Sequence, residues 1–167
     1  IPAGKDFELL AFGADGEPTT GRPRVLAYDP DAPRPDLETG ISVQPNAGQP
    51  TIVSGLPAGP VLVVTGGRRT EFALQAHQAD TSQTEVVEVR LRPGTPVVLL
   101  REGDLPPRTW FVLSDDRGLP LSSGRYLTRD VDLVPGRYRL HGYDGERELF
   151  QTTFEVGDAR LVVRYGG

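Results

Sequence analysis

Short segments in which apolar and polar residues alternate constrain the fold of this chain more than any other feature. The clearest is residues 84–91, where apolar residues alternate with Glu88 and Arg90, and residues 137–141 and 160–165 repeat the scheme. Successive side chains of a β-strand point to opposite faces of its sheet, so this pattern predicts strands with one buried and one solvated face. We therefore expect an all-β protein of antiparallel sheets packed as sandwiches, with less than about 10% helix.

Further segments have the composition of strands and lie between turn residues. The 20 glycines and 16 prolines supply those turns, as is typical of a loop-rich β protein. The additional predicted strands are residues 7–12, 23–28, 51–54, 60–65, 70–76, 96–101, 109–114, 125–129 and 148–155.

One sequence motif, a turn followed by a strand, occurs twice in the chain. GLPAGPVLVVTGG at residues 55–67 and LVPGRYRLHGYDG at residues 133–145 each contain a turn with proline and glycine, a strand, and a second glycine turn. Upstream of each copy of this motif, a turn with aspartate, glycine and proline is followed by a glycine and then by a strand. The duplication predicts two tandem antiparallel β-sandwiches, residues 1–92 and 93–167.

These residues resemble the carboxypeptidase regulatory-like family, also called prealbumin-like or transthyretin-like domains. Residues 14–25 with 55–64 carry the family's turn and central-strand motifs, and residues 114–127 with 133–140 carry them again. The resemblance implies that both sandwiches are Ig-like or prealbumin-like. It also implies that they have no zinc site or active site of their own, because catalysis in carboxypeptidases belongs to a different domain.

A proline-rich excursion, residues 29–49, departs from that pattern. Loops of this length are usually functional or disordered, and we expect it to project from the first domain and to be its most variable or contact-forming region. Asp29, Asp31, Asp36 and Glu38 lie in it. Their oxygens are the ligands that calcium prefers, but prolines interrupt them, so both a solvated loop and a weak calcium site stay open.

No arrangement of residues predicts catalysis or a bound cofactor. The only histidines are His77 and His141, and neither has the spacing of a metal ligand or lies beside a nucleophile motif. Cysteine is absent, which excludes disulfides and thiolate chemistry. Asp115 and Asp116 precede Gly118 and are expected to shape a turn through hydrogen bonds to the backbone. We predict that the protein is not an enzyme and has no cofactor.

Aromatic residues are concentrated in the second half of the chain. Trp110 and Phe111 are neighbours on a predicted strand and must point to opposite faces, so one of them should be exposed or lie at an interface. Core or interface packing explains most of these aromatics, and a sugar-stacking platform is the alternative. The candidate ligand-binding residues are Trp110 and Tyr143.

Charge and hydropathy narrow the function further. The net charge of −5 argues against a general nucleic-acid binder, and the longest apolar run, residues 60–64, is far too short to span a membrane. The chain begins at Ile1 without methionine, so we expect a signal peptide or another upstream portion.

We predict a secreted, periplasmic or surface protein of bacteria. It would be a structural or interaction module, acting as spacer, docking surface or filament subunit, and pairing with other domains or with its own copies through edge strands. The alternative is a carbohydrate-binding accessory domain.

Overall fold

The computed structural model describes residues 6–13, 16–17, 23–31, 37, 41–42, 51–67, 71–83 and 86–166. Strands connected by turns make up this part of the chain, and none of these residues lies in an α-helix. Accordingly, the described residues contain no helix with the length and apolar character needed to cross a membrane. The predicted all-β class is confirmed.

The first seven strands, here called the N-terminal half, form two sheets. Their strand orders are β4-β1-β7 and β3-β2-β5-β6. The sheets enclose a cluster of buried aliphatic side chains that includes Leu9, Val25 and Val89. The strands are β1 (Phe7–Phe12), β2 (Arg24–Ala27), β3 (Ile41–Ser42), β4 (Thr51–Val53), β5 (Pro60–Thr65), β6 (Gln75–Asp80) and β7 (Val86–Arg90).

The last seven strands, the C-terminal half, repeat this pairing scheme. Their sheets have the orders β11-β8-β14 and β10-β9-β12-β13, so each strand has a counterpart seven positions earlier. In both halves the first and last strands pair in parallel, and the other pairs are antiparallel. The strands are β8 (Thr95–Arg101), β9 (Trp110–Asp115), β10 (Pro120–Gly124), β11 (Asp130–Leu133), β12 (Gly136–Asp144), β13 (Arg147–Val156) and β14 (Leu161–Tyr165).

The predicted alternation of buried and exposed faces is confirmed in β7, β12 and β14. Val87 and Val89 are buried while Glu88 and Arg90 are exposed, and β14 buries Val163 between exposed neighbours. Alternation does not distinguish parallel from antiparallel pairing, because the side-chain period of two is the same in both. The two parallel pairs were therefore not expected from the pattern.

The predicted strand over residues 70–76 begins too early: residue 70 lies outside the described residues, residues 71–74 form bends and irregular backbone, and strand β6 begins at Gln75. The backbone just before it bonds elsewhere: the N–H of Ala73 donates to the carbonyl oxygen of Arg92 at 2.8 Å, and that of Leu74 to the carbonyl oxygen of Asp132 at 2.9 Å. The bond to Asp132 connects the segment to the C-terminal half, and β6 joins the β5 ladder only from the pair of Thr65 and Gln75 onward.

The predicted strand over residues 125–129 is also wrong. These residues form bends and irregular backbone that carry the chain from β10, in one sheet, to β11, in the other. Strands lie on either side of the segment instead. The short β3 and both of these edge strands were not predicted.

Strand β5 is buried on both faces, which explains the apolar run at residues 60–64. Val61 and Val63 are completely buried in the core of the N-terminal half. Leu62 and Val64 point the other way, into a cluster that continues into the core of the C-terminal half. A strand between two apolar layers loses the alternating pattern of a strand that faces water on one side.

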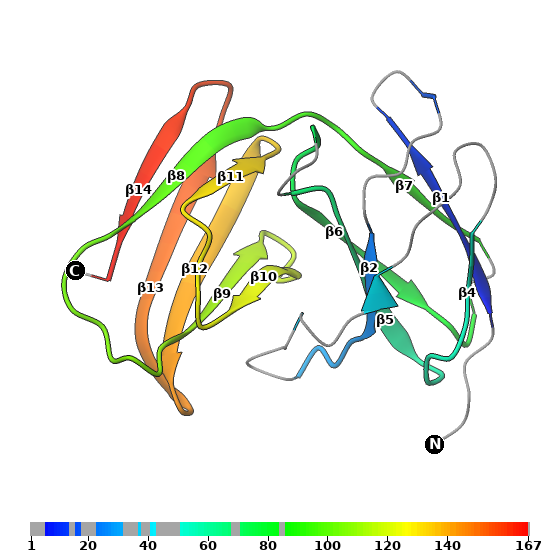
Figure 1. Cartoon of the computed structure of the whole chain (residues 1–167), viewed down its shortest axis with the longest axis horizontal. Helices are drawn as coiled ribbons and strands as arrows, with labels where there is room; N and C mark the ends of the chain where they lie inside the picture. The colour runs from blue at the N-terminus through cyan, green and yellow to red at the C-terminus, as the bar shows by residue number, and fades with distance from the viewer. Residues whose placement is uncertain are drawn as a thin grey trace.

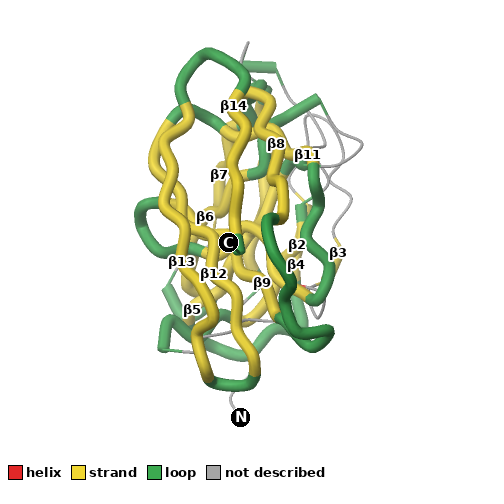
Figure 2. Tube along the Cα trace, turned by 90° about the vertical axis from the view of Figure 1, so that its left-hand side faces the viewer, coloured by secondary structure: helices red, strands yellow, loops and turns green. Residues whose placement is uncertain are grey.

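The two halves lie side by side along the longest axis of the molecule (Figure 1). Sheet β4-β1-β7 lies at one end and strand β14 at the other. Viewed from the second end, β14 runs beside β8 (Figure 2), in agreement with their parallel pairing. Between the halves, apolar side chains of β2, β5 and β6 that point away from their own core cluster with residues of the C-terminal half, such as Leu121 of β10 and Leu133 of β11. We call this contact region the seam.

Candidate functional site

The structure brings the two predicted ligand-binding residues together. Trp110 on β9 is the direct cross-strand partner of Tyr143 on β12, and both side chains are partly buried. Phe111 points to the opposite face and is buried in the core, as predicted for this neighbouring pair. His141 is stacked on Tyr143 with ring centroids 5.9 Å apart and an interplanar angle of 7°. The outer face of this sheet therefore carries a short aromatic row.

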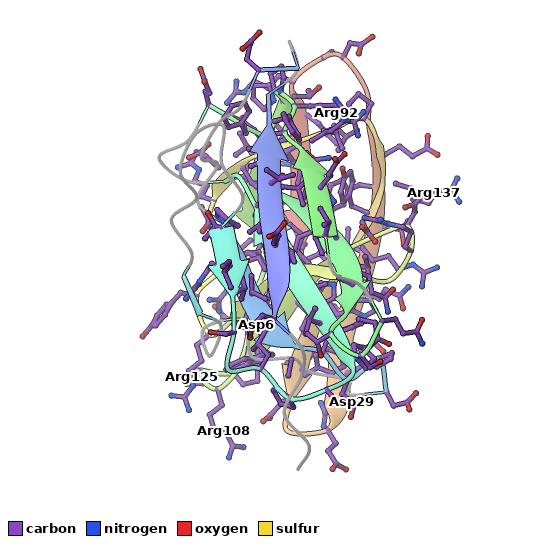
Figure 3. All side chains as sticks on the ribbon, turned by 90° about the vertical axis from the view of Figure 1, so that its right-hand side faces the viewer. Asp6, Asp29, Arg92, Arg108, Arg125 and Arg137 are labelled. Carbon is purple, nitrogen blue, oxygen red and sulfur yellow. The ribbon has the colours of Figure 1, made fainter. Side chains whose placement is uncertain are left out.

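A shallow hollow of about 460 Å³ lies at the end of that row. Its lining residues include Trp110, Arg108, Arg125 and Asp144. Arg108 and Asp144 form an ion pair of 3.3 Å, and the indole Nε1 of Trp110 is buried without a hydrogen-bond partner. Figure 3 shows Arg108 and Arg125 projecting from the same corner of the molecule. The hollow thus combines an aromatic surface with hydrogen-bond donors and one carboxylate.

The two histidines lie in different surroundings. The Nε2 atom of His77 is 3.3 Å from the hydroxyl of the buried Thr65, and burial together with the guanidinium groups of Arg117 and Arg92 lowers the pKa of His77 to about 4. His141 contacts the Glu148 carboxylate at 3.3 Å on the outer sheet face. The Thr65 hydroxyl is the one nucleophile type in these two contacts, and it is buried in the core, away from any substrate in solvent.

The carboxylates proposed as a weak calcium site are only partly described. Asp29 and Asp31 are exposed, and the backbone N–H of Asp31 donates to Oδ1 of Asp29 at 2.9 Å, so this carboxylate shapes its own turn. Asp36 lies outside the described residues. Within the described residues, no group of three or more acidic or histidine side chains is placed to hold a metal ion. The calcium site stays a prediction.

The seam contains functional candidates that sequence reasoning missed. Leu37, from the proline-rich excursion, is buried, and its N–H donates to the hydroxyl of Ser123 on β10 at 3.1 Å. At this residue the excursion does not project from the N-terminal half but forms a contact with the C-terminal half. Most of the excursion lies outside the described residues. A cavity of about 610 Å³ runs along the seam and is lined by both halves, for example by Leu26 and Leu121.

Apolar side chains are exposed on the outer face of sheet β4-β1-β7. Ile52 on β4 and Val86 on β7 have exposed fractions of 67% and 47% and flank Glu8 of β1 in one cross-strand row. Figure 3 looks onto this face, with β1 between its two neighbours. The alternating pattern of β7 places Val86 on the solvent-facing side of the strand. This pattern is the sequence signal that could have identified an exposed apolar residue here.

The turn predicted at Asp115 is confirmed. Its Oδ1 atom accepts hydrogen bonds from the backbone N–H groups of Arg117 at 2.9 Å and Leu119 at 3.0 Å. Gly118 has a φ of 81°, which favours glycine because a side chain is strained there. The carboxylate thus fixes the loop between β9 and β10.

No protein-family model matches the chain, and no curated protein matches it. Among solved structures, the Bacillus anthracis TIE protein aligns with 98% of this chain at 14% identity and a TM-score of 0.37. The alignment covers only 33% of that solved chain. The shaft pilin SpaA from Lactobacillus rhamnosus GG aligns over 96% of this chain and 97% of its own, at 10% identity and a TM-score of 0.37. A minor pilin of Streptococcus agalactiae aligns over 95% and 94%, at 14% identity and a TM-score of 0.33. Alignments this weak assign neither a function nor a partner to the chain, and the resemblance to carboxypeptidase regulatory-like domains stays a prediction.

Proposed function

We propose that this chain is a non-catalytic structural module of a bacterial cell-envelope or secreted protein. Its two halves act as tandem sandwich domains, residues 1–92 and 93–167, that hold neighbouring parts of an assembly apart and offer surfaces for docking. The observation that carries the proposal is the placement of β1 and β14 at opposite ends of the long axis (Figure 1), with a buried seam between them.

The seam favours a spacer over two domains on a flexible tether. Leu62 is completely buried and Leu26 is 6% exposed, yet both lie on the sheet face that points away from their own sandwich core. Separating the halves would expose these side chains to water at a cost of roughly 25 cal/mol per Å² of apolar area. Such a contact restrains the relative orientation of the halves, as a spacer requires.

Spin-label distance measurements test the spacer directly. The chain has no native cysteine, so Glu8→Cys and Val162→Cys, both at exposed positions, label the two end sheets uniquely. If the spacer is rigid, the distances between the two spin labels form one narrow distribution. This distribution should not change when salt is added or when the protein is moderately diluted. A broad distribution between these labels in the folded protein would contradict the proposal.

The edge strand β4 is the docking surface that we assign to a second copy of the chain. Among the described strands β4 pairs only with β1 and lies at the edge of its sheet, and Ile52 on this strand is exposed. Ile52→Lys should abolish self-association measured by sedimentation at high concentration. Val162→Lys, on the other end sheet, is the matched control and should leave it unchanged. Equal loss in both variants would contradict docking at β4.

Carbohydrate binding is the second candidate function, and the hollow beside Trp110 favours it. Trp110 lines this hollow and contributes aromatic surface to it. Sugars present hydroxyl acceptors together with an apolar face that stacks on aromatic rings. The neighbouring Arg108 and Asp144 supply further hydrogen-bonding groups.

A glycan array with the whole chain separates the two functions. Binding that is lost in both Trp110→Ala and Tyr143→Ala, while Tyr126→Ala retains it, would establish the carbohydrate site. Tyr126 is a suitable control because its side chain is 92% exposed and lies outside that hollow. Absence of binding to every glycan class leaves the structural module as the function.

A further inference from the structure

The first and last strands of each half form a parallel ladder. Residues 8–12 of β1 pair with residues 86–90 of β7, and residues 97–101 of β8 pair with residues 161–165 of β14. One more hydrogen bond extends each ladder: Leu91 N–H donates to the Phe12 carbonyl oxygen at 2.6 Å, and Glu102 N–H to the Tyr165 carbonyl oxygen at 2.7 Å. The same arrangement therefore occurs twice.

Parallel pairing decides how such a ladder responds when the chain is pulled from its ends. Tension enters β1 at its N-terminal end and leaves β7 at its C-terminal end. Because the strands point the same way, these are opposite ends of the pair, and the pull slides the strands along one another. All hydrogen bonds of the ladder are then loaded together. An antiparallel hairpin pulled at its two open ends is instead peeled apart one bond at a time.

The two ladders are connected in series by a short, well-held link. Residues 91–94 lead directly from β7 to β8 and pass from one half to the other (Figure 1). Leu91 is completely buried, and the carbonyl oxygen of Arg92 accepts a hydrogen bond of 2.8 Å from Ala73. Tension along the chain therefore reaches the second ladder through a link anchored in the first half.

We propose that the two ladders are mechanical clamps, which let the chain bear tension along the path β1, β7, β8 and β14 without unfolding. This inference rests on the proposed role as a spacer. It adds that the load which the spacer withstands is tension along the chain. The remaining strands complete the cores but lie off the force path, because neither end of the chain pulls on them while the ladders hold.

Constant-force unfolding of the whole chain, flanked by marker domains and held at its two ends, tests the clamps. Matched valines in the same cores separate strands on the force path from strands off it. In the N-terminal half, Val89 of β7 and Val61 of β5 are both completely buried in one cluster. In the C-terminal half, Val163 of β14 and Val156 of β13 are 5% and 4% exposed in one cluster.

Each valine-to-alanine change should lower the free energy of chemical unfolding by a similar amount within its pair. Under force, Val89→Ala and Val163→Ala should raise the unfolding rate of their half about tenfold, because they weaken the ladder that yields first. Val61→Ala and Val156→Ala should leave that rate within about twofold of the parent, since their contacts remain in the mechanical transition state.

Equal acceleration by both members of each pair would overturn the clamp proposal. If one alanine variant does not fold, isoleucine at the same position, which keeps the strand apolar, provides a second comparison of forced and chemical unfolding. Failure of the clamp proposal is distinguishable from failure of the spacer proposal, because the spin-label distances are measured without load. A narrow distance distribution with no difference between paired variants would retain the spacer and remove the clamps.

Discussion

Nη2 of Arg117 donates a 2.7 Å hydrogen bond to the carbonyl oxygen of Ala76 and so ties the β9–β10 turn to strand β6 across the seam. The same guanidinium group binds the Asp115 carboxylate, from Nε at 3.1 Å and from Nη2 at 2.6 Å. Asp115 also fixes the backbone of the turn, so the turn presents Arg117 to β6 in a preset orientation. Two segments far apart in the sequence are joined by one side chain.

Replacing Arg117 by alanine should weaken the seam. The lost hydrogen bonds are charge-assisted, but 58% of the Arg117 side chain is exposed, so we expect a loss of only about 1 kcal/mol in the free energy of unfolding. Urea unfolding measures this change. The control is Arg137→Ala, because Arg137 pairs with Glu155 within one half and both side chains are largely exposed. A similar destabilisation in both variants would show that Arg117 does not act through the seam.

His77 should make the protein less stable in mild acid. Burial, followed by the charges of Arg117 and Arg92, lowers its pKa in the folded state from 6.5 to about 4. Between these two pH values the unfolded chain binds a proton that the folded protein does not, so stability falls as the pH falls from about 6.5 to about 4. The loss reaches about 3 kcal/mol, since one pKa unit corresponds to about 1.4 kcal/mol.

Unfolding free energies measured across that window check the effect. His77→Gln, which keeps a polar side chain near Thr65, should reduce the slope of stability against pH between about pH 4 and 6.5. An NMR titration of the imidazole gives the folded-state pKa independently. The idea fails if the parent and the variant have the same slope.

The sequence pattern predicted most of the strands, including β5, which is buried on both faces, but it missed β3, β10 and β11. Strand β11 alternates Val131 and Leu133 with aspartates, a signal that could have identified it. Strand β10 has no such signal, because its two serines are held by backbone pairing with β9 at an irregular register. The parallel ladders could not be predicted, since they depend on where the ends of each half meet in space.

The candidate site was predictable only in part, for a related reason. Trp110 and Tyr143 stood out as aromatics, but only the register of β9 and β12 makes them neighbours. The seam was not predictable, because Leu37 lies among prolines and polar residues, and Arg117 looked like an ordinary turn residue. Their roles depend on the opposite half, which local composition does not describe.

Gly94 should not tolerate a side chain. A Cβ atom there would lie 2.6 Å from the Cβ of Ala73 and 2.8 Å from the backbone nitrogen of Leu133, which is too close for either to remain in place. We expect Gly94→Ala to destabilise the protein by about 1–3 kcal/mol, as overpacking does. Gly157→Ala is the control, because nothing lies within 4 Å of its added Cβ. Thermal unfolding of both variants checks the prediction, and equal midpoints would contradict the close packing of the link.

The shared core predicts that the two halves unfold together, and Leu62 is the residue that tests this. Leu62 of β5 and Leu9 of β1 are both completely buried, but Leu62 faces the C-terminal half while Leu9 lies in the core of its own half. Either change to alanine should lower the free energy of unfolding by about 2–5 kcal/mol.

In scanning calorimetry, the parent and Leu9→Ala should show one transition whose calorimetric and van't Hoff enthalpies agree. Leu62→Ala should separate the transitions of the two halves, because it removes contacts across the seam. Two transitions in the parent, or identical cooperativity in both variants, would show that the seam does not couple the halves.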